Sequence, residues 1–189
     1  MDLGGYGFSP ARIGAIGSIA GFIVVVVNLV LVPRLLKKIG PVYSFRLAAI
    51  VYLPTVMFMP LLSLLAPYNE NTAMLVLFFA LFVVNILWRV MALNTMFTSV
   101  FVLINNSVMP ENRGRLNGFG QSLVAVTRCI GPTLGSSLFS WSLTNELSFP
   151  FNIYFTFIVM FVLHLFNIVQ SWLLPRATDK PKNELVAGK

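Results

Sequence analysis

Hydrophobic residues dominate five long segments of the chain, and short polar segments separate them. A helix that crosses a bilayer needs about 20 mainly apolar residues. The five segments that meet this length cover residues 13–32, 47–66, 73–104, 118–143 and 149–174. The pattern therefore predicts an all-α fold, a polytopic membrane helical bundle with five transmembrane helices in a single domain, residues 1–174.

Prolines follow three of these segments. Pro33, Pro67 and Pro175 stand directly after the first, second and fifth, and proline lacks the N–H that continues a helix. We therefore expect the helices to close there. The third segment is longer than the hydrocarbon core, so it must tilt or extend beyond it. Residues 175–189 are polar and Lys-rich, and we expect a disordered cytosolic tail.

The overall composition supports the membrane assignment. Of the 189 residues, 57% are apolar and only 10% are charged, whereas soluble domains average about 25% charged residues. Soluble domains and disordered chains are both excluded. The 13 basic and 6 acidic residues give a net charge of +7. In a membrane chain this excess reports orientation rather than binding to nucleic acid.

The basic residues are distributed unevenly between the two sides of the predicted bundle. Alternating spans put only Arg12 on the first side, with Asp2, Glu70 and Glu146. The other side holds Arg34, Lys37, Lys38, Arg46, Arg113, Arg115, Arg176, Lys180, Lys182 and Lys189. The positive-inside rule then predicts an outside amino terminus and a cytosolic carboxyl terminus. Plasma membrane and vacuolar membrane both stay open.

Two arginines lie inside the predicted spans. Arg89 is midway along the third segment and Arg128 is near the middle of the fourth, and none of the five segments contains Asp or Glu. An unpaired arginine there costs about 2.5–3.5 kcal/mol on insertion scales. We predict that both line an aqueous path, where they meet an anionic solute or an acid from another helix. Bonding to backbone carbonyls, or snorkelling along a tilted helix, is the alternative.

Two amides accompany these arginines. Asn85 precedes Arg89 by four residues and so shares its helix face, and Gln121 is a polar position of the segment that holds Arg128. We predict that all four are substrate-binding residues. Hydrogen bonding between helices explains each amide alone equally well.

Small residues form stripes on two segments. Gly17 and Gly21 lie in the first, and Gly131, Pro132 and Gly135 lie in the fourth. Small residues spaced by three permit close helix packing, and an internal proline is a kink site. Packing alone explains these positions, and gating between moving helices is the other interpretation.

Enzymatic chemistry lacks the residues that it needs. No pair of intramembrane Asp residues is present, and the single histidine and single cysteine, His164 and Cys129, form no catalytic set or metal cluster. We therefore predict no enzyme activity, no cofactor and no metal site. A lone histidine can relay protons, but a hydrogen bond to a neighbouring helix is the simpler explanation.

Three stretches resemble the major facilitator superfamily of transporters. Residues 17–21 with the basic run Pro33-Arg34-Leu35-Leu36-Lys37-Lys38-Ile39-Gly40 resemble the loop between its helices 8 and 9. Residues 105–118, NNSVMPENRGRLNG, resemble the loop between helices 10 and 11 of one branch, and residues 121–142 resemble its helix 11. That branch is the drug:proton-antiporter-like group, which includes zinc-induced-facilitator-like and related fungal transporters.

The resemblance implies a partial major facilitator fold in which the five spans correspond to helices 8–12. It implies a secondary active transporter that works by alternating access, coupled to protons, with an amino-terminal half as the missing partner. The interior arginines favour an anionic solute, and antiport and symport both stay open. It further implies gate or loop-anchor roles for Arg34, Lys37, Lys38, Gly40, Arg113 and Gly114, although the positive-inside signal alone explains the basic ones.

A different class competes with this interpretation. Five helices cannot enclose a pathway between two pseudo-symmetric halves, and the interior arginines require partners from elsewhere. The chain could therefore be a non-transporting, truncated membrane protein, or an assembly partner of another transporter half.

Overall fold

The computed structural model describes residues 9–62 and 72–187, and these residues form helices and no strand. The first three elements are α1 (Pro10–Val26), the π-helix η1 (Val27–Leu31) and α2 (Val32–Ile39). The others are α3 (Pro41–Leu62), α4 (Thr72–Asn106), the 3-10 turn η3 (Pro110–Asn112), α5 (Arg113–Thr144), α6 (Phe155–Ser171), the 3-10 turn η4 (Arg176–Asp179) and α7 (Lys182–Ala187). The predicted all-α class is confirmed for this part of the chain.

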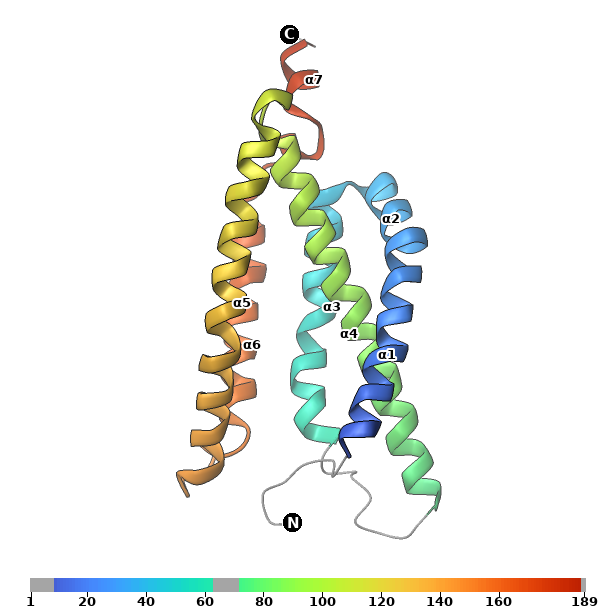
Figure 1. The fold of residues 1–189 in the computed structure, drawn as a ribbon, viewed down its shortest axis with the longest axis vertical. Helices are drawn as coiled ribbons and strands as arrows, with labels where there is room; N and C mark the ends of the chain where they lie inside the picture. The colour runs from blue at the N-terminus through green and yellow to red at the C-terminus, as the bar shows by residue number, and fades with distance from the viewer. Residues whose placement is uncertain (1–8, 63–71, 188–189) are drawn as a thin grey trace.

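The long helices run alongside one another between two ends of the molecule (Figure 1). The connections from α2 to α3 and from α4 to α5 lie at one end, together with η4 and α7. The start of α1 and the connection from α5 to α6 lie at the opposite end. The predicted basic segments are therefore gathered at a single end of the bundle, which we call the basic end.

The first helix continues through Pro33, where the sequence predicts an end. The N–H of Val32 donates to the carbonyl of Val27, a π-helical bond that completes η1. Pro33 then occupies the first turn of α2, where no intrahelical donor is required. The helix ends instead at Gly40, whose φ of 80° is a conformation that favours glycine.

The core lies between α3, α4 and α6. One cluster of buried side chains comprises Phe45, Ala48, Ala49, Tyr52 and Val56 of α3, Ala92 and Met96 of α4, and Ile168 of α6. A second cluster joins Leu62 of α3 to Phe78 and Phe82 of α4. Alanines at the contact let the helix backbones approach closely. We call α3 and α4 the packed pair.

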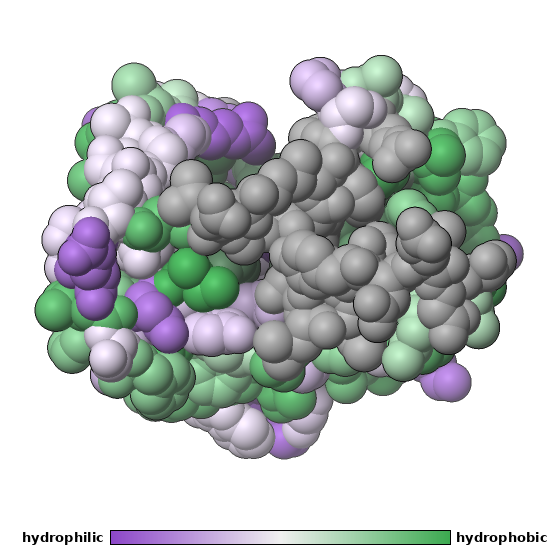
Figure 2. Space-filling model, turned by 90° about the horizontal axis from the view of Figure 1, so that it is seen from below, coloured by the Kyte–Doolittle hydropathy of each residue, from purple (hydrophilic) through white to green (hydrophobic). Residues whose placement is uncertain are grey.

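Helix α5 is the exception to this packing, because Ser142 is the only buried residue between its bounds. It also carries most of the Gly, Ser and Thr residues that lie in the helices. Figure 2, seen from the end where α1 begins, shows pale and purple residues gathered on the side of α5 and α6. The side of α1 and α4 is mostly green, which marks hydrophobic residues.

Three of the described helical stretches are long and apolar enough to cross a membrane. They are Gly14–Ile39, Pro41–Leu62 and Val76–Asn106. Helix α6 is apolar but shorter, because it begins at Phe155 after a turn, six residues beyond the predicted start. Helix α5 is long enough but more polar. The predicted residues 63–66 of the second span lie outside the described residues.

The tail contacts the bundle, and its predicted disorder stays a prediction. Oδ1 of Asp179 accepts a hydrogen bond of 2.8 Å from the N–H of Val42, and the side chain of Asn106 donates to the carbonyls of Thr178 and Asp179. The first turn of a helix leaves N–H groups without acceptors, and Asp179 supplies one to α3. The tail is therefore tied to the basic end of the bundle.

Candidate functional site

Asn85 and Arg89 lie one turn apart on α4. Asn85 is 6% exposed, and its Oδ1 has no hydrogen-bond partner among the described residues. Arg89 is half-buried, and its guanidinium carbon lies 5.8 Å from the ring centroid of Tyr52 in α3. Leaving a buried acceptor without a partner costs about 1–3 kcal/mol. The position is therefore suited to water or to a bound polar molecule.

Gln121 and Arg128 lie on α5, and both side chains are exposed. The guanidinium carbon of Arg128 lies 5.8 Å from the ring centroid of Phe97 in α4. Among residues 9–62 and 72–187, no carboxylate pairs with Arg89 or Arg128, and an aromatic ring faces each instead. Such a contact contributes about 0.5–2 kcal/mol, which is less than the insertion cost of an arginine. Both charges can accept an anionic partner.

A cavity of about 280 Å³ lies between the four helices α3, α4, α5 and α6. Its lining includes Phe45, Met96, Phe97, Gly120, His164 and Asn167. Phe97 both lines the cavity and faces Arg128. Complete small-molecule sites usually measure about 300–1,000 Å³, so this cavity has the size of part of such a site.

His164 makes the hydrogen bond that the sequence suggests. Its Nε2 lies 2.9 Å from the carbonyl oxygen of Ala49 in α3. Its ring centroid is 4.7 Å from that of Tyr52, and Tyr52 in turn faces Arg89. The histidine of α6 and the arginine of α4 therefore contact the same tyrosine.

Asn28, in the π-helix η1, was not predicted as a site residue. Its Nδ2 donates to Oδ1 of Asn94 in α4 at 3.3 Å, and its own Oδ1 is buried with no partner in the described part of the chain. Asn28 is the single amide in the apolar first segment, and this polar residue in an apolar helix was the available signal. The π-helical turn and a polar contact to α4 thus coincide.

Three known transporters are similar to this chain in sequence. A probable peptide/nitrate transporter of Arabidopsis thaliana is 30% identical over 139 residues, which is 74% of this chain and 27% of the relative. The zinc induced facilitator-like 1 protein of the same plant is 26% identical over 139 residues, with the same shares. A major facilitator-type transporter of Psilocybe cyanescens is 27% identical over 193 aligned positions, or 98% of this chain and 35% of the relative.

The chain is homologous to major facilitator superfamily transporters. The resemblance to the zinc-induced-facilitator-like and fungal branch is thereby confirmed. The chain spans about a quarter to a third of the length of these relatives. No family model matches it. No solved structure matches it either. Its homology and its apolar helices support an integral membrane protein.

In this major facilitator homologue, the predicted gate residues lie at the basic end. Arg34, Lys37 and Lys38 are exposed on α2, and Gly40 ends that helix. Arg113 begins α5, and its Nε donates to the carbonyl of Asn105 at 3.2 Å. Gly114 follows it, with no atom within 4 Å of an added Cβ. Arg113 therefore holds the α4–α5 connection, as a loop anchor would.

Arg46, counted in the sequence as a cation of a loop, lies in the packed pair and is 8% exposed. Its Nε donates to Ser171 O at 3.1 Å, and its Nη2 donates to Leu174 O at 3.0 Å and to Trp172 O at 3.4 Å. These are carbonyls at the end of α6, where a helix attracts positive charge. Arg46 therefore joins α3 to α6.

The small-residue stripes of the homologue face open space. A Cβ added at Gly17, Gly21, Gly131 or Gly135 would meet no atom within 4 Å. Pro132 lies inside α5, which continues past it to Thr144. The close packing predicted at these glycines has no counterpart among the described helices, and it stays a prediction about a partner outside them.

Proposed function

We propose that this chain is the carboxyl-terminal part of a secondary active transporter that moves a small solute by alternating access. The observation that carries the proposal is the pair of interior arginines, Arg89 and Arg128, which face aromatic rings and no carboxylate among the described residues. In a homologue of transporters, two such charges suit an anionic solute in an aqueous path.

On this proposal the five long helical stretches correspond to helices 8–12 of the family. The continuous stretch from α1 through η1 to α2 is helix 8, and α3, α4, α5 and α6 are helices 9–12. The exposed polar surface of α5 is what a helix lining a central pathway presents when the other half of the transporter is absent. Gln121 and Asn85 would assist the two arginines, and the glycine stripes of α1 and α5 would pack against the amino-terminal half.

We further propose that the basic end is cytosolic and that transport is coupled to protons. The first proposal rests on the gathering of basic residues at that end. The second rests on homology to the branch alone. Arg34, Lys37, Lys38, Gly40, Arg113 and Gly114 would then form the cytosolic gate and its loop anchors.

A non-transporting assembly partner is the second candidate function. The small size of the cavity, about 280 Å³, and the open faces of α1 and α5 favour it, because a complete pathway needs walls on every side. On this view the chain acts only when another membrane protein covers those two faces.

Transport by the purified chain separates the two candidates. The chain is reconstituted in sealed vesicles with an imposed pH gradient, and uptake of labelled anionic and cationic solutes is measured. Arg128→Gln is compared with Lys182→Gln, which removes a charge from α7, away from the helices of the candidate site. Saturable uptake of an anion that only Arg128→Gln abolishes supports the transporter. Absence of uptake by the inserted, helical chain overturns transport by this chain alone and favours the assembly partner.

A further inference from the structure

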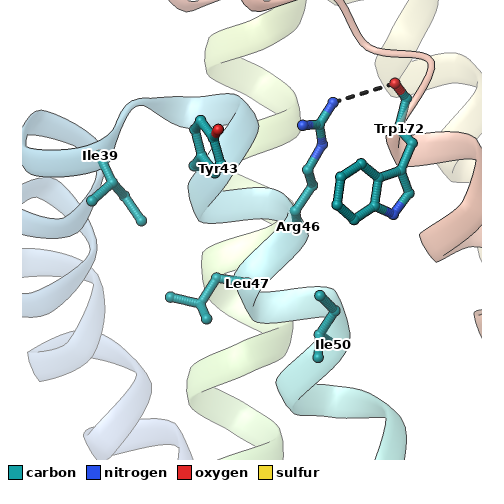
Figure 3. Close-up of a pocket in the computed structure, with 6 residues that line it drawn as sticks. All are labelled: Ile39, Tyr43, Arg46, Leu47, Ile50 and Trp172. Carbon is teal, nitrogen blue, oxygen red and sulfur yellow. Dashed lines mark hydrogen bonds between the residues drawn. The ribbon is translucent and has the colours of Figure 1, made fainter.

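A groove of about 530 Å³ lies at the basic end, between α2, the first turns of α3 and the end of α6 (Figure 3). Its lining residues are Ile39, Tyr43, Arg46, Leu47, Ile50 and Trp172. In Figure 3, Arg46 reaches up between the rings of Tyr43 and Trp172, and Leu47 and Ile50 continue down α3. The groove is therefore polar and aromatic at one end and aliphatic at the other.

The groove occupies the open face of α3. Tyr43, Leu47 and Ile50 are 40%, 47% and 49% exposed, and their spacing places them on a single face of the helix. Phe45 and Ala49 belong to the core cluster on the other side. In an integral membrane protein, an apolar helix face that no other helix covers is open to lipid or to another membrane helix, and the charge at this groove distinguishes the two.

Positive charge is concentrated at the aromatic end of this groove. Arg46 lies 4.9 Å from the ring centroid of Trp172, and Arg176 lies 4.8 Å from that of Tyr43 and donates a hydrogen bond to its hydroxyl. No described carboxylate pairs with either arginine. Asp179, on the same turn as Arg176, accepts from the N–H of Val42 instead. Two positive charges thus lie at this end of the groove without a salt bridge to a described carboxylate.

We propose that this groove binds an anionic phospholipid from the membrane leaflet at the basic end. One acyl chain lies along Leu47 and Ile50, and the phosphate lies beside Arg46 and Arg176. Tyr and Trp are the residues that gather at the level of lipid headgroups, and basic side chains near that level attract anionic lipids. The site lies on the outer face of α3, away from Arg89 and Arg128, so it does not depend on transport.

Quenching of Trp172 fluorescence tests the proposal directly. The full chain carrying Trp88→Phe and Trp141→Phe keeps Trp172 as its only tryptophan. It is placed in nanodiscs of phosphatidylcholine that contain bromine-labelled phosphatidylserine or bromine-labelled phosphatidylcholine. We expect phosphatidylserine to quench at a mole fraction several-fold lower than phosphatidylcholine does. Arg176→Gln should lower the preference for phosphatidylserine over phosphatidylcholine about fivefold. Lys182→Gln removes the same charge from α7 and should lower this preference less.

Larger side chains that fill the groove provide a second test of the proposal. Leu47→Phe and Ile50→Phe each place a larger side chain where the acyl chain lies, and each should weaken quenching by phosphatidylserine. Far-UV circular dichroism identifies the variant that keeps its helices, and that variant is the one compared. Equal quenching by the two lipids, or a preference that survives both Arg176→Gln and the filled groove, overturns the proposal. Absence of quenching by either lipid also overturns it, because it means that protein covers the groove.

Discussion

Helices α3 and α5 differ in the burial of their polar side chains. In α3, Arg46 donates to three backbone carbonyls of another segment, and Thr55 is buried and bonds within its own helix. In α5, Gln121 and Arg128 are exposed, and Arg128 has a ring contact alone. Arg46 of α3 and Arg128 of α5 thus differ in whether the guanidinium is hydrogen-bonded to other segments of the described chain.

The difference divides the buried core around α3, which stabilises the bundle, from the exposed surface of α5. Twelve residues of α3 are buried, against one of α5, so α3 fixes the positions of α4 and α6. Helix α5 contributes little to that core, and its Gln121 and Arg128 are exposed. This division predicts that substitutions of buried residues in α3 and α4 change stability more than substitutions of exposed residues in α5.

Phe78→Ala should have the largest effect on stability. Phe78 is fully buried in the packed pair, and removing a buried phenyl ring leaves a cavity that costs about 3–5 kcal/mol. Phe119→Ala in α5 is the matched control, because Phe119 is 62% exposed and its loss should stay within about 0.5 kcal/mol. Unfolding by SDS in mixed micelles, followed by circular dichroism, measures both. Similar losses for the two variants would contradict the division.

Arg46→Ala should cost about 2–3 kcal/mol, because charged hydrogen bonds to the carbonyls at the end of α6 are lost. Arg128→Ala removes the same type of side chain from α5 and should leave the unfolding midpoint nearly unchanged. The same titration gives both values. If Arg128→Ala destabilises the chain as much as Arg46→Ala does, α5 is part of the scaffold.

Gly40→Ala should cost about 1–2 kcal/mol, because the φ of 80° and ψ of 159° at this residue form a conformation that residues other than glycine rarely adopt. Asp179 adds a steric reason, since its Oδ1 lies 2.9 Å from an added Cβ. Asp179→Ala alone should cost about 1 kcal/mol through loss of the helix cap. A double-mutant cycle checks the contact: the cost of Gly40→Ala should fall when Asp179 is already alanine. Strictly additive costs would argue against it.

His164→Phe should have the smallest effect, about 1 kcal/mol, because it removes one hydrogen bond to Ala49 O and keeps a ring beside Tyr52. The SDS titration again gives the value. Asn167→Ala, next to it in the lining of the cavity, is the control and should be close to neutral. A larger loss for Asn167→Ala would mean that the cavity lining, rather than this bond, stabilises α6.

The sequence was sufficient for the features that follow from local pattern. Hydropathy and length predicted a helical bundle, and the spacing of four residues predicted that Asn85 and Arg89 share a face. Contacts between segments that are distant in the chain could not be predicted from the sequence. Nothing local distinguishes Arg46 from a loop cation, because its acceptors lie 125 residues or more along the chain. The cap at Val42 likewise depends on Asp179, 137 residues away.

The residue types of the candidate site could be predicted from the sequence, but the side chains that contact them could not. The lack of acidic residues in the spans was visible in the sequence, and rings facing Arg89 and Arg128 were not. Asn28 was overlooked because an amide next to a run of valines carries no signal for a π-helix. Pro33 was expected to end its helix because a local rule considers the missing N–H and not the preceding turn.

The π-helical turn at Val27–Leu31 has a consequence for comparing homologues. Its hydrogen bonds span five residues rather than four, so the turn holds one residue more than an α-helical turn. That residue rotates the faces of α1 and α2 by about 100° relative to an uninterrupted helix. A homologue with regular helix geometry here needs one residue fewer to present the same two faces. Alignments of this segment should therefore carry a single-residue gap near Asn28.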